Sequence, residues 1–78
     1  MQPKVTVYST TICPYCDMMK NFLGQQNIAY TNVDIQKDQK AANRLVEKTG
    51  QMGVPQTQIG NEWVLGFDPN RVLKILNK

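Results

Sequence analysis

Cys13 and Cys16 are the only cysteines of the 78-residue chain, and Pro14 and Tyr15 separate them. Two thiols at this spacing have three chemical uses: a structural disulfide, part of a metal site, or a reversible dithiol–disulfide pair. The chain contains no histidine. Nucleophile pairs that need an imidazole are therefore excluded, and any chemistry must come from sulfur.

A purely structural disulfide is a weak explanation of the pair. Cross-linking residues so close in the chain removes little entropy from the unfolded state, and a reducing cytosol would open the bond. Two inert buried thiols do not fit either. Cys13 is expected to cap a helix at a strand-to-helix junction, and such a position is normally exposed.

Metal binding is the alternative from another class of function. Structural zinc requires four nitrogen or sulfur ligands, and this chain supplies two sulfurs. Zinc, copper or an iron–sulfur cluster would have to be shared across a dimer or with external thiols. Small copper carriers also have a CxxC pair, but their strands and helices follow the order βαββαβ. In this chain the second helix is predicted to precede the hairpin. We therefore expect no bound metal.

The third use, a redox pair, fits the local physics best. Cys13 precedes Pro14, which favours the first position of a helix. Unpaired backbone N–H groups and the positive end of the helix dipole would stabilise a thiolate there, lowering its pKa from about 8.5 toward the range of about 3.5–7.5. Cys16 lies one helical turn further, within bonding reach. We expect Cys13 to attack and the deeper Cys16 to resolve.

Size and charge narrow the remaining possibilities. The chain is predicted to form one domain, 1–78, and folding at this size buries roughly 60% of the extended chain's surface. Its net charge of +3 is scattered, without a cluster of basic and aromatic residues, so nucleic-acid binding is not expected. No apolar run approaches the ~20 residues of a membrane span, and no secretory signal is visible, so we expect a cytoplasmic protein.

Periodicity predicts an α/β fold in the order βαβαββα. Strands are expected at 4–9, 29–35 and on both sides of a Gly60-Asn61 turn within 55–66, and helices at 14–26, 38–48 and from Pro69 onward. The first two strands should be parallel, joined by a right-handed helical crossover, and the hairpin should complete a mixed four-stranded sheet. The residues expected to face the core are Met19, Phe22 and Leu23, then Ala41, Ala42, Leu45 and Val46, and finally Val72, Leu73 and Leu76.

Several motifs together resemble the dithiol glutaredoxins, a branch of the thioredoxin fold. They are "CPYC" after a strand, "TGQMGVPQTQIG" further along and "GFDP" before the last helix, and the resemblance covers nearly the whole chain. It implies a thiol–disulfide oxidoreductase, an electron carrier without a bound cofactor. By this resemblance Cys13 is the nucleophile and Cys16 the resolving thiol.

The resemblance also implies substrate-binding roles. Pro55 would follow a cis peptide bond, and the Val54 backbone would lie beside the cysteines and pair with a substrate's extended chain. On sequence alone, a trans proline opening an edge strand is the better reading of Pro55. Tyr15 would line the substrate groove, although it also reads as a partly buried helix aromatic.

Gly66, Phe67 and Asp68 match the turn that receives the γ-glutamyl end of glutathione in the family. Asp68 is equally well explained as a cap of the helix that starts at Pro69.

Two positions depart from the glutathione-using members. Thr10 stands where they usually have a lysine, and Ala42 where they tend to have Gln or Arg. Both family residues hold the glycine carboxylate of glutathione, so their loss would weaken its use, unless Lys40 or Arg44 compensates.

"WVLGFDP", from Trp63 to Pro69, is similar to the Trp-x-Gly-Phe-x-Pro motif of the NrdH redoxins, with one residue inserted. That sister branch reduces ribonucleotide reductase and takes electrons from a flavin-containing reductase. Trp63 and Phe67 also read as ordinary packing residues, and "CPYC" points to the glutaredoxins. We expect an NrdH-like monomer that reduces protein disulfides, with ribonucleotide reductase as the candidate partner and a disulfide reductase as electron donor; a glutathione-dependent glutaredoxin is the alternative.

Overall fold

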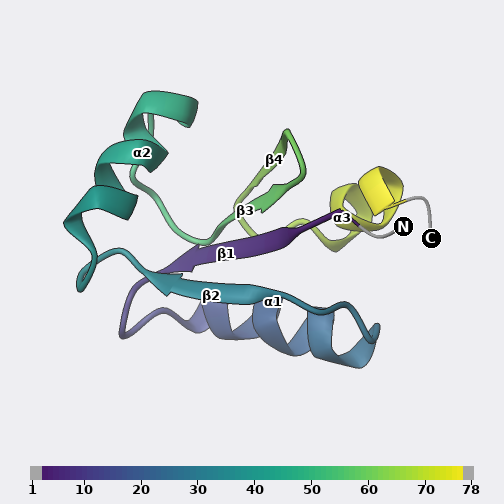
Figure 1. Cartoon of the computed structure of the whole chain (residues 1–78). Helices are drawn as coiled ribbons and strands as arrows, with labels where there is room; N and C mark the ends of the chain where they lie inside the picture. The colour runs from purple at the N-terminus through teal and green to yellow at the C-terminus, as the bar shows by residue number, and fades with distance from the viewer. Residues whose placement is uncertain (1–2, 77–78) are drawn as a thin grey trace.

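The computed structural model describes residues 3–76 and has the element order predicted from the sequence (Figure 1). The elements are β1 (Val5–Ser9), α1 (Pro14–Gln25), β2 (Thr31–Asp34), α2 (Gln39–Thr49), β3 (Gln56–Ile59), β4 (Glu62–Leu65) and α3 (Pro69–Leu76). The largest difference from the prediction is β2, which begins at Thr31 instead of Ala29. Proline opens both α1 and α3, as expected for a residue without an N–H to leave unpaired.

The four strands form one mixed sheet in the order β2-β1-β3-β4. β1 runs parallel to β2, and β3 is antiparallel to both β1 and β4. The β3–β4 hairpin closes with Ile59 opposite Glu62, and Gly60 in the turn has a φ of 59°, which favours glycine. The two central strands adjoin the site loops: β1 leads into the loop that carries Cys13, and the loop that carries Pro55 leads into β3.

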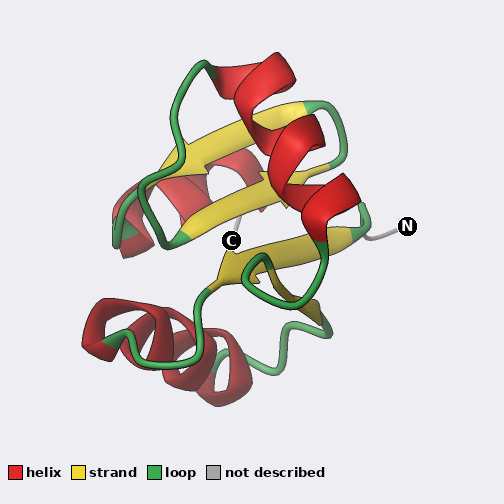
Figure 2. Cartoon of the chain, turned by 90° about the vertical axis from the view of Figure 1, so that its left-hand side faces the viewer, coloured by secondary structure: helices red, strands yellow, loops and turns green. Residues whose placement is uncertain are grey.

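Helices cover both faces of this sheet, so that the core is divided in two. α1 and α3 pack against one face, and α2 packs against the other (Figures 1 and 2). The first cluster contains Val5, Val7, Met19, Leu23, Ile28, Ile59, Val64 and Val72. The second contains Tyr8, Ile35, Ala41, Ala42 and Leu45. Val7 and Tyr8 are neighbours on β1, and their side chains enter opposite clusters because side chains alternate along a strand.

The predicted core faces need two corrections. Val46 is 40% exposed, because Ala41, Ala42 and Leu45 already fill the face of α2 that meets the sheet. Leu73 is half-buried and belongs to neither cluster; Val72 is the fully buried residue of α3.

Both ends of α2 are closed by residues suited to capping. Asp38 caps its N-terminus, where the Oδ1 atom accepts a hydrogen bond from the Ala41 N–H at 3.0 Å. Gly50 ends it in the left-handed conformation, with a φ of 74°. In the part of the chain that the structure describes, no helix has the length and apolar character to cross a membrane.

Candidate active site

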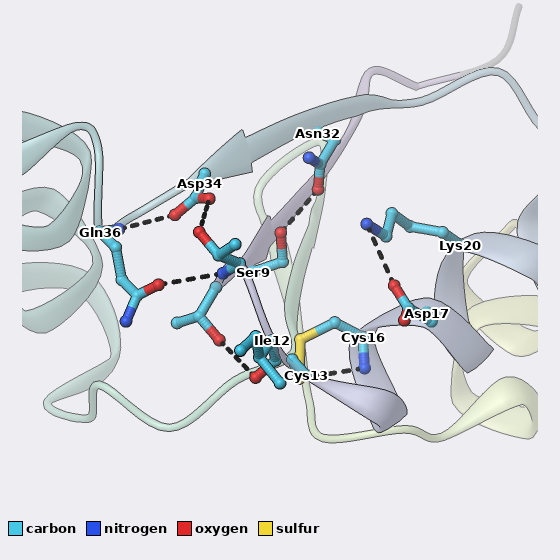
Figure 3. Close-up of polar contacts among 11 residues, drawn as sticks. Ser9, Ile12, Cys13, Cys16, Asp17, Lys20, Asn32, Asp34 and Gln36 are labelled. Carbon is cyan, nitrogen blue, oxygen red and sulfur yellow. Dashed lines mark hydrogen bonds and ion pairs between the residues drawn. A yellow bond between two sulfur atoms is a disulfide. The ribbon is translucent and has the colours of Figure 1, made fainter.

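Cys13 and Cys16 form a disulfide at the start of α1, with their Cα atoms 5.2 Å apart (Figure 3). Cys13 is the N-cap residue, in extended conformation, and its Sγ atom accepts a hydrogen bond from the Cys16 N–H at 3.2 Å. The cap position predicted for Cys13 is therefore confirmed. Cys13 is half-buried, whereas Cys16 is completely buried. A reagent in solvent can thus reach the first sulfur and not the second.

The residues beside Cys13 present apolar surface to solvent. The side chain of Ile12 is 89% exposed and that of Tyr15 is 63% exposed. Tyr15 is therefore not a partly buried helix aromatic, and the alternative reading of this residue is wrong. The disulfide is bordered by side chains suited to contact a partner.

The Val54–Pro55 peptide bond is cis, as the family resemblance implied. Gln56 pairs with Tyr8 in the antiparallel β1–β3 ladder. Continuing this register beyond β3 brings Pro55 and Val54 to the end of the sheet from which β1 leads to the cysteines. Among residues 3–76, the Val54 N–H and C=O have no hydrogen-bond partner, while the Val54 side chain packs against the α2 cluster. The backbone of Val54 is thus free to pair.

The turn from β4 to α3 is hydrogen-bonded to the cis-proline segment. Gly66 has a φ of 77°, and its N–H donates to the Pro55 carbonyl at 2.9 Å. Phe67 packs against the α1–α3 core cluster, and the Asp68 Oδ1 atom accepts a hydrogen bond from the Arg71 N–H at 3.1 Å. Asp68 is therefore a helix cap, and Phe67 is a packing residue.

Trp63, part of the NrdH-like motif, also has a packing role. Its ring stacks on Tyr8 with the centroids 5.5 Å apart, on the face of the sheet that α2 covers.

The two positions that depart from the glutathione-using members carry no charge toward the disulfide. Thr10 donates a hydrogen bond to the Ile12 carbonyl at 3.4 Å, within its own loop. Ala42 is a buried residue of α2, on the helix face that meets the sheet. Arg44 lines a pocket that extends along the sheet to Lys4 and Gly60, at the opposite end from the cysteines. Nothing in this arrangement supports Arg44 as a replacement for the missing contacts.

A polar network that we did not predict anchors the loop before Cys13 to the end of β2 (Figure 3). The Thr11 hydroxyl donates to Asp34 Oδ2 at 2.8 Å, and the Thr11 N–H donates to Gln36 Oε1 at 3.0 Å. The Thr11 hydrogen bond is the largest cause of the lowered pKa of the Asp34 carboxyl. Between β1 and β2 themselves, the buried Ser9 donates to Asn32 Oδ1 at 2.7 Å. The sequence contained a signal for this network: the first two strands were predicted to be parallel, and parallel strands end at the same edge of a sheet, so polar residues at their ends should lie close together.

Metal ligands are sparse around the disulfide. Within residues 3–76, no group of three or more Cys, Asp or Glu side chains is close enough together to hold a metal ion.

Comparison with protein families and relatives agrees with this geometry. The glutaredoxin family model matches residues 5–64. A glutaredoxin-like 8.6 kDa protein in the rubredoxin operon of Clostridium pasteurianum is 30% identical over 74 residues, which cover 95% of this chain and 99% of that protein. The chain spans 64% and 66% of the lengths of two plant glutaredoxins that it also matches.

Solved structures show the same fold. The thioredoxin-like protein BC3987 superposes with a TM-score of 0.87 and 36% identity, covering 94% of this chain and all of that one. NrdH-redoxin from Escherichia coli superposes with a TM-score of 0.83, covering 92% and 93%, but at 19% identity. The fold is therefore thioredoxin-like, and this chain belongs to the glutaredoxin family of thiol–disulfide oxidoreductases.

Proposed function

We propose that this protein is a dithiol reductant of protein disulfides, with Cys13 as the nucleophile and Cys16 as the resolving thiol. The observation that carries the proposal is the asymmetry of the pair. Cys13 is half-buried, and its sulfur caps α1 and accepts a backbone hydrogen bond, whereas Cys16 is fully buried. The same N–H and the helix dipole favour a thiolate at Cys13 once the disulfide is reduced.

The reaction proceeds through two exchanges. The Cys13 thiolate attacks one sulfur of the substrate disulfide, a mixed disulfide forms, and the other substrate sulfur leaves as a thiolate that takes a proton from water. Cys16 then loses its proton and attacks the Cys13 sulfur. The Cys13–Cys16 bond forms, the second substrate thiol leaves, and two electrons have passed from the protein to its substrate. An external reductant restores the dithiol.

The binding surface in this proposal lies on both sides of the disulfide. Tyr15 offers an exposed ring, and the Val54 backbone offers an unpaired N–H and C=O in front of Pro55. An extended substrate segment adds to such an edge by strand-like pairing. The Gly66 N–H holds the Val54–Pro55 segment in place through its hydrogen bond to the Pro55 carbonyl.

We further propose the NrdH-like role, in which a flavin-containing disulfide reductase supplies the electrons and ribonucleotide reductase receives them in the cytoplasm. The protein would act as a monomer and without a bound cofactor. Thr10 and the buried Ala42 support this choice over glutathione, because both lack the charge-assisted contacts of glutathione-using members. Two lost contacts of this kind, at about 1.5–3 kcal/mol each, would weaken glutathione use by orders of magnitude.

A coupled assay with alternative electron donors tests the proposal. Reduction of an insulin disulfide would be followed with glutathione plus glutathione reductase, and in parallel with flavin- and ferredoxin-linked disulfide reductases. We expect slow turnover with glutathione and fast turnover with a reductase. Rapid glutathione-driven turnover would make the protein an ordinary glutaredoxin. A visible absorbance band in freshly purified protein, with no turnover from any donor, would favour a metal or cluster carrier.

A further inference from the structure

A buried glutamine follows the cis-proline directly. Gln56 opens β3 and is 1% exposed. Its Nε2 atom donates two hydrogen bonds, to the Gln51 carbonyl at 3.0 Å and to the Gly53 carbonyl at 2.8 Å. Its Oε1 atom is buried without a partner among the described residues. An unpaired buried carbonyl is costly, so an amide at this position calls for an explanation beyond packing.

The loop that Gln56 holds has few other constraints. Gln51, Met52 and Gly53 are exposed and lie outside helix and strand. The Gln51 carbonyl, which accepts from Gln56, also accepts a hydrogen bond from the Thr49 hydroxyl at 3.2 Å. For the Gly53 carbonyl, the side chain of Gln56 is the only hydrogen-bond donor within residues 3–76.

The Gly53 carbonyl has a direct geometric link to Val54. The Gly53 C=O and the Val54 N–H belong to one peptide unit, which is planar and, being trans, points these two groups in opposite directions. A donor buried beneath the Gly53 oxygen therefore turns the Val54 N–H away from the interior. This N–H is one of the two groups that our proposed function assigns to substrate pairing.

We propose that Gln56 is a positioning residue for extended peptide substrates. Its carboxamide fixes the orientation of the Gly53–Val54 peptide, and this prepares the Val54 N–H to receive a backbone carbonyl of the substrate. The proposal depends on the reductase activity proposed above. It separates two substrate classes, because only a disulfide flanked by peptide groups uses the Val54 backbone, whereas a small synthetic disulfide needs the Cys13 sulfur alone.

Gln56→Met provides the test, because it removes both hydrogen bonds and keeps an unbranched side chain of similar length. Steady-state kinetics would be measured on an extended peptide disulfide and on bis(hydroxyethyl) disulfide. We expect kcat/KM for the peptide to fall about tenfold, mainly through a higher KM, as the loss of an ordinary hydrogen bond would give. For the small disulfide we expect a change of less than about twofold, well below that loss.

Gln58→Met is the matched control. Gln58 lies on the same face of β3 and makes no hydrogen bond to the loop; it accepts one from the Tyr8 hydroxyl at 3.5 Å. Both substrates should react with this variant as with the unmodified protein. Gln56→Leu, which leaves no polar side-chain atom to bury, is the second variant if Gln56→Met does not fold, and the same split between substrates is expected.

Each other outcome has a distinct meaning. Equal losses for both substrates, or no loss for either, would overturn the role of Gln56, and so would failure of both Gln56 variants to fold. If the unmodified protein reduces neither disulfide, the proposed function itself is wrong. The amide signal of Val54 gives an independent readout: its chemical shift and hydrogen exchange should change in Gln56→Met and remain unchanged in Gln58→Met.

Discussion

Asp34 accepts a hydrogen bond from the Thr11 hydroxyl at 2.8 Å and so joins the end of β2 to the loop that leads to Cys13. A second oxygen of the same carboxylate accepts from the Gln36 N–H at 2.9 Å. Both bonds are stronger to the ionised carboxylate than to the neutral acid, and they lower the pKa of Asp34 below its ordinary value of 3.8. The link between the end of β2 and the loop before Cys13 therefore depends on pH.

Asp34→Asn is expected to remove part of the acid sensitivity of the fold. Because the pKa of Asp34 is lower in the folded protein, its contribution to stability is present above pH 3.8 and is lost as the pH falls through the lowered value. Urea unfolding midpoints measured from neutral to acidic pH test this. The variant should be less stable than the unmodified protein at neutral pH, and the difference should vanish in acid. A difference that is constant with pH would contradict the assignment.

Exchanging each cysteine for serine should separate the two roles. Cys13→Ser is expected to abolish disulfide reduction, because the accessible sulfur is lost. Cys16→Ser should still attack a substrate and then retain it as a mixed disulfide, since nothing resolves the bond. Non-reducing gel electrophoresis with a disulfide-containing substrate detects the trapped species. If both variants trap the substrate equally poorly, the assigned roles are refuted.

In the reduced protein, the Cys13 thiol should titrate well below an unperturbed cysteine. Its position at the N-terminus of α1, with the Cys16 N–H directed at the sulfur, predicts a pKa below about 7.5 instead of about 8.5. The rate of alkylation of Cys16→Ser as a function of pH measures it. A thiol that stays protonated above pH ~8 would remove the electrostatic basis of the mechanism.

Two glycines should respond to alanine in opposite directions. Gly24 lies within α1, is exposed, and has open space where a Cβ would be, so Gly24→Ala should stabilise the protein by about 0.5–1 kcal/mol. Gly50 has equally open space but a φ of 74°, so Gly50→Ala should destabilise it by roughly 1–2 kcal/mol. Chemical denaturation of both variants checks the pair, and a stabilising Gly50→Ala would be inconsistent with the helix end described.

The neighbours Leu45 and Val46 test the boundary of the core under α2. Leu45 is completely buried, and Leu45→Ala should cost about 2–5 kcal/mol of unfolding free energy. Val46 is 40% exposed, so Val46→Ala should change the stability by about 0.5 kcal/mol or less. Urea denaturation measures both. A large loss of unfolding free energy in Val46→Ala would instead support the wider buried face of α2 that was predicted from the sequence.

The sequence was sufficient for the element order, for the sheet and for the cap position of Cys13, because hydrophobic periods, prolines and glycines act locally. It was insufficient for Val46 and Leu73, since a helical period shows which residues are apolar but not how wide the contact with the sheet is. The cis state of Pro55 could be expected only from family resemblance.

The polar contacts of the site were harder still to predict. Gln56 is buried although its residue type favours the surface, and nothing in the period of β3 distinguishes it from Gln58. The Thr11–Asp34 contact joins the loop after β1 to the last residue of β2, so its formation depends on strand register. Such long-range contacts follow from the tertiary arrangement, not from local patterns.

The central position of β3 beside β1 has a consequence for the newly made chain. Both cysteines precede β3 in the chain, so they are synthesised before the Val54–Pro55 segment and before the strand that pairs with β1 on its other side. The complete redox site therefore exists only after β3 has been made and has paired with β1.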